Sequence, residues 1–91
     1  MEIKHEEARF YIGAIAHPDA ELTYRKDEDG DIIIDHTIVS EKLQGQGVAA
    51  KLVDQAVEFA REQKKQIVPQ CSYALKKIEA TPDYHDVWKG K

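Results

Sequence analysis

A glycine-rich segment, Gln44-Gly45-Gln46-Gly47, comes immediately before the longest helical pattern of the chain. Glycine lets the backbone turn sharply and approach a ligand closely, because it has no Cβ atom. A helix that starts there presents unpaired N–H groups and the positive end of its dipole, which favour a phosphate or pyrophosphate. The segment has neither the Lys-Ser/Thr pair of a Walker A loop nor the glycine spacing of the dinucleotide fingerprint. A tight turn with a helix cap, and no ligand, explains the same residues.

His36 and Cys71 carry two further groups that could take part in chemistry. The imidazole of a histidine accepts protons near neutral pH, so His36 is a candidate base, and a core histidine packed beside Ile34 and Ile38 is the alternative. Cys71 is the only cysteine, so it forms no internal disulfide. It ends a predicted strand just before a helix N-terminus, which favours the reactive thiolate. A buried, unreactive cysteine is the alternative.

Three strands are predicted ahead of the glycine-rich segment. They cover Ala8–Ile15, Ala20–Lys26 and Asp31–Val39, and the short turns between them predict antiparallel neighbours. The first turn is Ala16-His17-Pro18-Asp19, and the second contains the Asp29-Gly30 step. Apolar residues occur on both faces of the third strand, so we expect it to be central and covered on both sides. Alternation places four of its side chains on one face, namely Ile32, Ile34, His36 and Ile38.

Helical spacing of apolar residues begins at Gly47 and predicts a long helix over Gly47–Gln66. A short strand, Ile67–Cys71, follows it, and a second helix covers about Tyr73–Ala80 with Ser72 as its N-cap. The predicted order is therefore β-β-β-α-β-α. This is an α+β fold with a mixed, mostly antiparallel sheet packed by one long and one short helix.

Size and charge limit what the chain can be. Its 91 residues allow one domain, residues 1–91, and leave no room for a second. The net charge of −4, from 13 basic and 17 acidic residues, comes without any basic block, which disfavours nucleic acid and anionic membranes as partners. His5, His17 and His85 lack metal-ligand spacing, so no metal site is expected.

The hydropathy pattern bears on location. No apolar stretch reaches the roughly 20 residues of a membrane-spanning helix. The first residues, Met1-Glu2-Ile3-Lys4, are charged and lack the apolar run of a signal peptide. We therefore expect a cytoplasmic protein.

The segment Gln44–Ala49 resembles the Gln/Arg-x-x-Gly-x-Gly/Ala motif of the GNAT superfamily of acyl-CoA-dependent N-acyltransferases. The similarity extends to His36–Val39, to the predicted helix over Val48–Arg61 and to Cys71–Ala74. Together these segments resemble the compact single-domain branch of the superfamily, the YjdJ-type acetyltransferase-like proteins.

The resemblance implies that acetyl-CoA is the co-substrate and that an amine accepts the acetyl group. It implies that the strand before the glycine-rich segment pairs with the pantetheine arm through the backbone of Thr37, Ile38 and Val39. The strand Ile67–Cys71 would diverge from its neighbour at the acyl group, which suits the proline at position 69. The backbone amides that would hold the pyrophosphate are those of Gln44, Gly45, Gln46, Gly47, Val48 and Ala49.

By the same resemblance, three residues are candidates for catalysis. His36 would take the proton of the amine, and Tyr73 would protonate the departing CoA thiolate. Cys71 would lie near the thioester as a nucleophile, a proton donor or a channel-lining residue. Tyr84 is a second candidate acid, and core positions are the alternative for both tyrosines. Exposed lysines that could meet the 3′-phosphate of CoA, or simply form solvated helix faces, are Lys51, Lys76 and Lys77.

The expected function is transfer of an acetyl group from acetyl-CoA to a primary amine of a small molecule or a protein. An acyl-CoA-binding or regulatory module with little or no transfer is the alternative, and a purely structural interaction domain is a third hypothesis. The chain lacks the first helical segments that usually wall the acceptor side in the superfamily. The acceptor site should therefore be open or completed by a partner subunit, and a monomer and a homodimer both fit.

Overall fold

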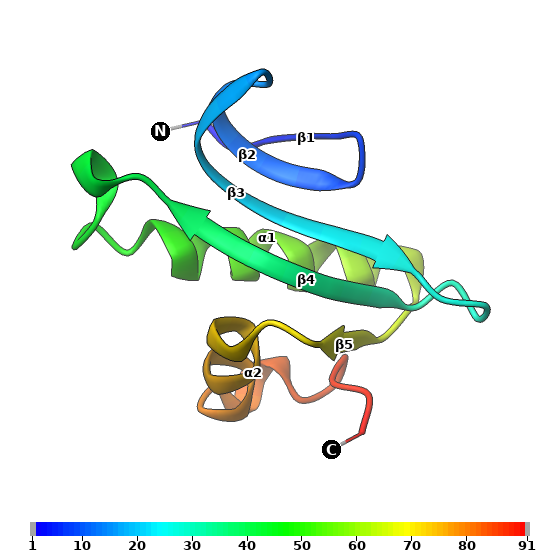
Figure 1. Ribbon diagram of the computed structural model, residues 1–91. Helices are drawn as coiled ribbons and strands as arrows, with labels where there is room; N and C mark the ends of the chain where they lie inside the picture. The colour runs from blue at the N-terminus through cyan, green and yellow to red at the C-terminus, as the bar shows by residue number, and fades with distance from the viewer. Residues whose placement is uncertain (1, 91) are drawn as a thin grey trace.

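The computed structural model describes residues 2–90 and is built around one five-stranded sheet in the order β1-β2-β3-β4-β5 (Figure 1). The first four strands are antiparallel neighbours, and β5 joins β4 in parallel after the crossover through α1. This architecture confirms the α+β fold class. The elements are β1 Lys4–Glu6, β2 Arg9–Ala14, β3 His17–Lys26, β4 Ile32–Val39, α1 Val48–Gln63, β5 Ile67–Pro69 and α2 Ser72–Glu79, with short 3-10 turns at Glu41–Leu43 and Pro82–Tyr84.

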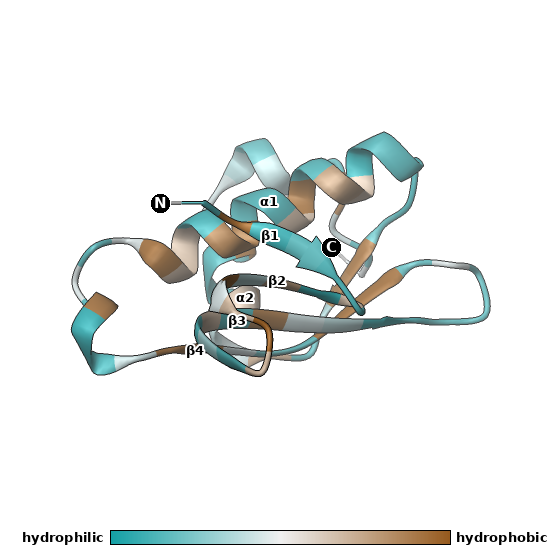
Figure 2. Cartoon of the chain, turned by 90° about the horizontal axis from the view of Figure 1, so that it is seen from above, coloured by the Kyte–Doolittle hydropathy of each residue, from teal (hydrophilic) through white to brown (hydrophobic). Residues whose placement is uncertain are grey.

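Helix α1 covers one face of the sheet, and α2 lies beside β5 (Figures 1 and 2). The apolar residues of α1 recur at helical spacing, so one stripe of the helix packs against the sheet while its charged residues point outward. Leu52, Val53 and Val57 are fully buried in this layer. Ala74 and Ile78 of α2 and Val87 of the following segment belong to the same core. Within residues 2–90, neither helix is both long enough and apolar enough to cross a bilayer.

Strand β4 changes its pairing at Asp35. Tyr24 pairs with Ile34 and Thr23 pairs with His36, so Asp35 is an extra residue in β4 and forms a β-bulge. The bulge interrupts the alternation of side chains. Ile34 is fully buried on the α1 side, whereas His36 is exposed on the opposite face.

Because of the bulge, the expected distribution of the β4 side chains between the two faces was wrong. His36 and Ile38 do not share a face with Ile32 and Ile34, and Ile38 is 56% exposed. Val39 instead packs against the core. The prediction that β4 is covered on both faces is confirmed only for the first half of the strand, where Ile33 is buried on the face opposite to Ile32 and Ile34.

The N-terminal half of the sheet holds two further differences from expectation. Strand β1 was not predicted, because its residues are exposed and charged and carry no apolar alternation. The segment His17-Pro18-Asp19 belongs to β3 rather than to a turn. Pro18 fits there because the register between β2 and β3 shifts beside its partner Gly13, where a ladder hydrogen bond is not required.

The ends of the later elements also differ from the predicted ones. Helix α1 stops at Gln63, because Lys64 adopts a left-handed conformation with φ +58°. Strand β5 ends at Pro69 rather than at Cys71. Helix α2 begins at Ser72, with Cys71 as its N-cap residue and no side chain bonded to the free amides, so the prediction of Ser72 as N-cap was wrong.

Candidate functional site

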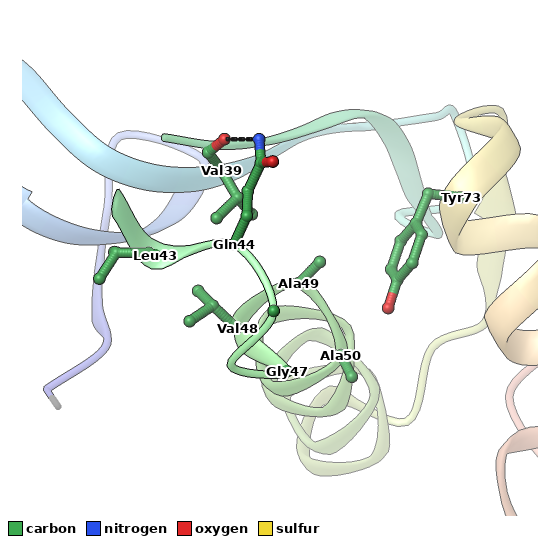
Figure 3. Close-up of a pocket in the computed structure, with 9 residues that line it drawn as sticks. Val39, Leu43, Gln44, Gly47, Val48, Ala49, Ala50 and Tyr73 are labelled. Carbon is green, nitrogen blue, oxygen red and sulfur yellow. Dashed lines mark hydrogen bonds between the residues drawn. The ribbon is translucent and has the colours of Figure 1, made fainter. Parts of the chain in front are cut away.

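A pocket of about 150 Å³ opens where β4, the glycine-rich segment, α1 and α2 meet (Figure 3). The sheet contributes the end of β4, and α2 contributes one aromatic side chain from across the pocket. The lining is mostly small and apolar, so much of the polar surface offered to a ligand is backbone. The lining residues are Val39, Leu43, Gln44, Gly45, Gly47, Val48, Ala49, Ala50 and Tyr73.

The two glycines of the segment are required by backbone conformation. Gly45 has φ +81° and Gly47 has φ +72°, a left-handed region that side chains with a Cβ atom adopt at a cost. A Cβ atom at either position would meet no other atom within 4 Å. The space beside this backbone is therefore open to a ligand rather than filled by the protein.

The start of α1 leaves amide groups unpaired. Gly47 is the N-cap residue, and no side chain caps the helix. The N–H of Lys51 bonds the carbonyl of Gly47 at 3.1 Å, so the amides of Val48, Ala49 and Ala50 have no partner within the helix. The first turn also has no acidic residue that would occupy the positive end of the helix dipole. This arrangement suits an anionic ligand.

Strands β4 and β5 separate next to the pocket. Their pairing ends at Ile34 and Pro69, where the N–H groups of Gln70 and Cys71 both lie 3.1 Å from the carbonyl oxygen of Ile34. Beyond this point the β5 side of β4 has no strand partner among the described residues. That side therefore offers backbone groups to a ligand.

The geometry of β3 indicates which backbone groups face this gap. The N–H of Ser40 donates to the carbonyl of Asp19 on β3 at 2.8 Å. By alternation, the backbone groups of Thr37 and Val39 point to the opposite side, away from β3. The Val39 carbonyl accepts a hydrogen bond from Nε2 of Gln44 at 3.2 Å, so a side chain of the glycine-rich segment bridges to the strand edge (Figure 3).

Cys71 and Tyr73 lie on the α2 side of the gap. The thiol of Cys71 is half-buried and lies 3.7 Å from Oγ1 of Thr37, across the point of separation. The ring of Tyr73 projects from α2 toward the start of α1 (Figure 3). Burial raises the pKa of Tyr73 above its usual value, and the nearby Cys71 adds to the rise. Its phenol therefore keeps its proton over the neutral range and can donate it.

His36 lies on the other face of β4. Its side chain is 51% exposed. Its Nδ1 lies 3.2 Å from Oγ1 of Thr23, and its Nε2 lies 3.8 Å from Oε1 of Glu21. The alternative of a core histidine beside Ile34 was therefore wrong. His36 is not a lining residue of the pocket that contains Tyr73, although it is the neighbour of Thr37 in the strand.

Other residues expected at the site are placed elsewhere. Thr37, Ile38 and Gln46 do not line the pocket, and the side chain of Gln46 donates to the carbonyl of Lys42. The phenol of Tyr84 donates to Asp54 at 3.0 Å, and burial, followed by this hydrogen bond, raises its pKa to about 12. Of the three lysines suggested for a phosphate, Lys51 and Lys76 are exposed and Lys77 is half-buried.

Four neighbours of the site were not identified from the sequence. Leu43 and Ala50 line the pocket, and only their adjacency to the glycine-rich segment could have suggested them. Glu21 and Thr23 contact His36 because of the bulge, for which the sequence offers no signal.

Comparison with known proteins gives a family match and matches to solved structures. The family profile described as GCN5-related N-acetyl-transferase matches residues 9–87. The chain is also similar to a GCN5-like candidate N-acetyltransferase from Staphylococcus aureus, whose structure was determined in solution by NMR, with 45% sequence identity and a TM-score of 0.84. That match covers 99% of this chain and 89% of the other. No curated protein matches the chain.

Proposed function

Because the chain belongs to the GCN5-related N-acetyltransferase family, we propose that it binds acetyl-CoA in the pocket at the start of α1 and acetylates a primary amine. The observation that carries the proposal is the uncapped start of α1, preceded by two left-handed glycines and facing the unpaired edge of β4. The amine itself and the cytoplasmic location expected from the sequence stay predictions.

The backbone around the pocket is suited to bind the CoA portion. The amides of the glycine-rich segment and of the first α1 turn would hold the pyrophosphate, since they are unpaired and lie at the positive end of the helix. The edge groups of Thr37 and Val39 would pair with the amides of the pantetheine arm. Gln44 would release the Val39 carbonyl, to which it now donates, when that arm binds.

Acetyl-CoA supplies a thioester whose carbonyl carbon can be attacked by an amine. Tyr73 would give its proton to the departing thiolate sulfur, since its raised pKa keeps the phenol protonated. His36, which lies on the exposed face of the sheet, would take the proton that the amine nitrogen loses. In this step a C–N bond forms as the C–S bond breaks, the amine proton goes to the imidazole and the phenol proton goes to the CoA sulfur. Proton exchange with solvent would then return one proton to Tyr73 and remove one from His36.

Cys71 allows a test of a two-step route. Its thiol lies beside Thr37 at the separation of the strands, so it could accept the acetyl group before the amine does. Intact mass after exposure to acetyl-CoA alone separates the routes. An acetyl adduct that is lost in Cys71→Ala supports the two-step route, and an unmodified protein with normal turnover supports direct attack.

Binding is tested by thermal unfolding with and without acetyl-CoA. A ligand at 100 times its Kd adds about 2.7 kcal/mol to the free energy of unfolding. For a domain of this size the Tm should rise by roughly 10 °C or more. Gly47→Ala should abolish most of this rise, because the left-handed turn that aims the amides is strained.

Gly90→Ala is the matched control for that variant. Gly90 has φ +94° and no atom within 4 Å of an added Cβ, so it suffers a similar strain away from the pocket. We expect it to keep the full ligand-induced rise. An unchanged Tm of the native chain at millimolar acetyl-CoA would contradict the proposal. A rise in Tm with no thiol release across a panel of amines would favour the acyl-CoA-binding module instead.

A further inference from the structure

Glu21 is a shielded carboxylate beside His36 that the reaction outlined above does not use. It lies on β3, on the exposed face of the sheet, yet its side chain is only 19% exposed. Nη1 of Arg9 lies 2.8 Å from Oε2 of Glu21, and the Arg9 side chain is 22% exposed. One carboxylate oxygen is therefore fixed from β2, while the other, Oε1, lies 3.8 Å from Nε2 of His36.

The bulge in β4 creates this contact. Because Asp35 is an extra residue, His36 pairs with Thr23 and Ile38 pairs with Glu21. His36 therefore turns toward the face that carries Glu21 and Arg9. Oγ1 of Thr23, also on β3, lies 3.2 Å from Nδ1 and 3.4 Å from Nε2 of the ring. The exposed imidazole is thus contacted from β3 by both Thr23 and Glu21.

Asp35, the acidic residue that precedes His36 in the chain, forms no ion pair with it among the described residues. Its carboxylate instead accepts a hydrogen bond from Nε of Arg25 at 3.1 Å. Arg9 binds Glu21 through a single oxygen and reaches toward Glu7 with its second nitrogen, at 3.4 Å. Glu21 therefore keeps one carboxylate oxygen directed at His36.

We propose that Glu21, fixed by Arg9, is a positioning residue that orients the His36 imidazole and balances the positive charge it gains when it takes a proton from the acceptor amine. The inference rests on the proposed function. At 3.8 Å, the carboxylate of Glu21 attracts a positive charge on the ring. The same attraction favours the ring orientation in which Nε2 faces Oε1.

Glu21→Gln tests the charge with little change of shape, because the amide oxygen can still accept a hydrogen bond from Arg9. We expect kcat for the best amine of the thiol-release panel to fall roughly tenfold, a small part of a general-base contribution, with an unchanged KM for acetyl-CoA. Glu21→Asp keeps the charge at a longer distance, and its kcat should lie between those of the native chain and Glu21→Gln. Glu7→Gln removes the other carboxylate from Arg9 and should leave kcat unchanged.

A double-mutant cycle separates this inference from the proposed function. In a His36→Ala background, Glu21→Gln should have no further effect on kcat, because Glu21 acts through the ring. If kcat falls in His36→Ala but is unchanged in Glu21→Gln, the positioning role is overturned and the proposed function stays intact. Fully active His36→Ala would overturn the base assignment and this inference together.

NMR of the unliganded protein supplies a readout that needs no amine. The ring resonances of His36 should move in Glu21→Gln and stay in place in Glu7→Gln. Unmoved His36 resonances in Glu21→Gln would overturn the inference even if no acceptor were found.

Discussion

The two halves of β4 differ from each other in burial and in strand pairing. Residues Ile32–Ile34 are buried on both faces and pair with β3 on one side and β5 on the other. Residues His36–Val39 pair with β3 alone, and their side chains are half-buried or exposed. We call these the closed half and the open half. The closed half holds the sheet together, and the open half offers the backbone edge that the proposed cofactor needs.

An ion-pair cluster lies at the closed half of β4. The carboxylates of Asp27, Asp29 and Asp31 lie within 4.8 Å of one another, a spacing that could hold a cation. Nζ of Lys89 lies 2.8 Å from Asp31 and 3.5 Å from each of the other two, and so offsets part of their negative charge. The hairpin before β4 is thereby tied to the segment that follows α2. Within residues 2–90, no strand pairs with the open half on its β5 side, which leaves that edge accessible.

Ile34 and Ile38 test the comparison with the same residue type in the same strand. Ile34 is fully buried and Ile38 is 56% exposed. Ile34→Ala should lower the free energy of unfolding by about 2–5 kcal/mol, since it leaves a cavity in the core. Ile38→Ala should change it by less than about 0.5 kcal/mol. Chemical denaturation measures both, and an equal loss in the two variants would contradict the division of β4.

Lys89→Met should have a smaller effect, and one that depends on pH. The hydrogen bond from Lys89 holds the pKa of Asp31 below its usual value, with a backbone N–H from Gln66 adding to this. A carboxyl with a lowered pKa stabilises the folded state above its unfolded pKa, about 3.9, and this stability is lost as pH falls through the folded pKa.

The Tm difference between the native chain and Lys89→Met should therefore be largest near pH 7 and shrink below about pH 4. Thermal unfolding across this range measures it. Lys76→Met is the control, because Lys76 is exposed and forms no ion pair within residues 2–90. A Tm difference that stays constant with pH would show that Lys89 acts through packing rather than charge.

Tyr73→Phe should have the smallest effect on stability and should act on the reaction instead. Tyr73 is 38% exposed, and removal of its hydroxyl leaves the ring in place. We expect a Tm within about 2 °C of the native chain, since exposed substitutions change stability little. The rate of thiol release should fall about tenfold or more, because the thiolate then leaves unprotonated. A normal rate would remove Tyr73 from the proposed mechanism.

The sequence predicted the elements that have strong periodic patterns. The α1 stripe and the β-branched run of β4 were identified. The α1 stripe is buried as expected, whereas in β4 the burial expected for the whole strand holds only for Ile32–Ile34. Strand β1 was missed because Lys4, His5 and Glu6 are exposed and their strand conformation depends on pairing with β2. Such edge pairing leaves no pattern in the residues themselves.

The candidate site was predicted in its backbone and less well in its side chains. Gly45 and Gly47 were identified because their chemistry is local, and both have positive φ. The predicted face of His36 was wrong because a β-bulge depends on how two strands align over their whole length. Glu21 and Thr23 escaped notice for the same reason, since the bulge alone brings them to the histidine.

The segment after α2 has a consequence for association between copies of the chain. The N–H of Ile67 donates to the carbonyl of Val87 at 2.6 Å, and the N–H of Lys89 donates to the carbonyl of Ile67 at 2.9 Å. These bonds occupy the outer edge of β5, where Trp88 forms a parallel bridge. An uncovered strand edge is a template for intermolecular β-sheet growth and aggregation. Residues 87–89 therefore occupy the outward backbone groups of Ile67, which blocks the addition of another strand there.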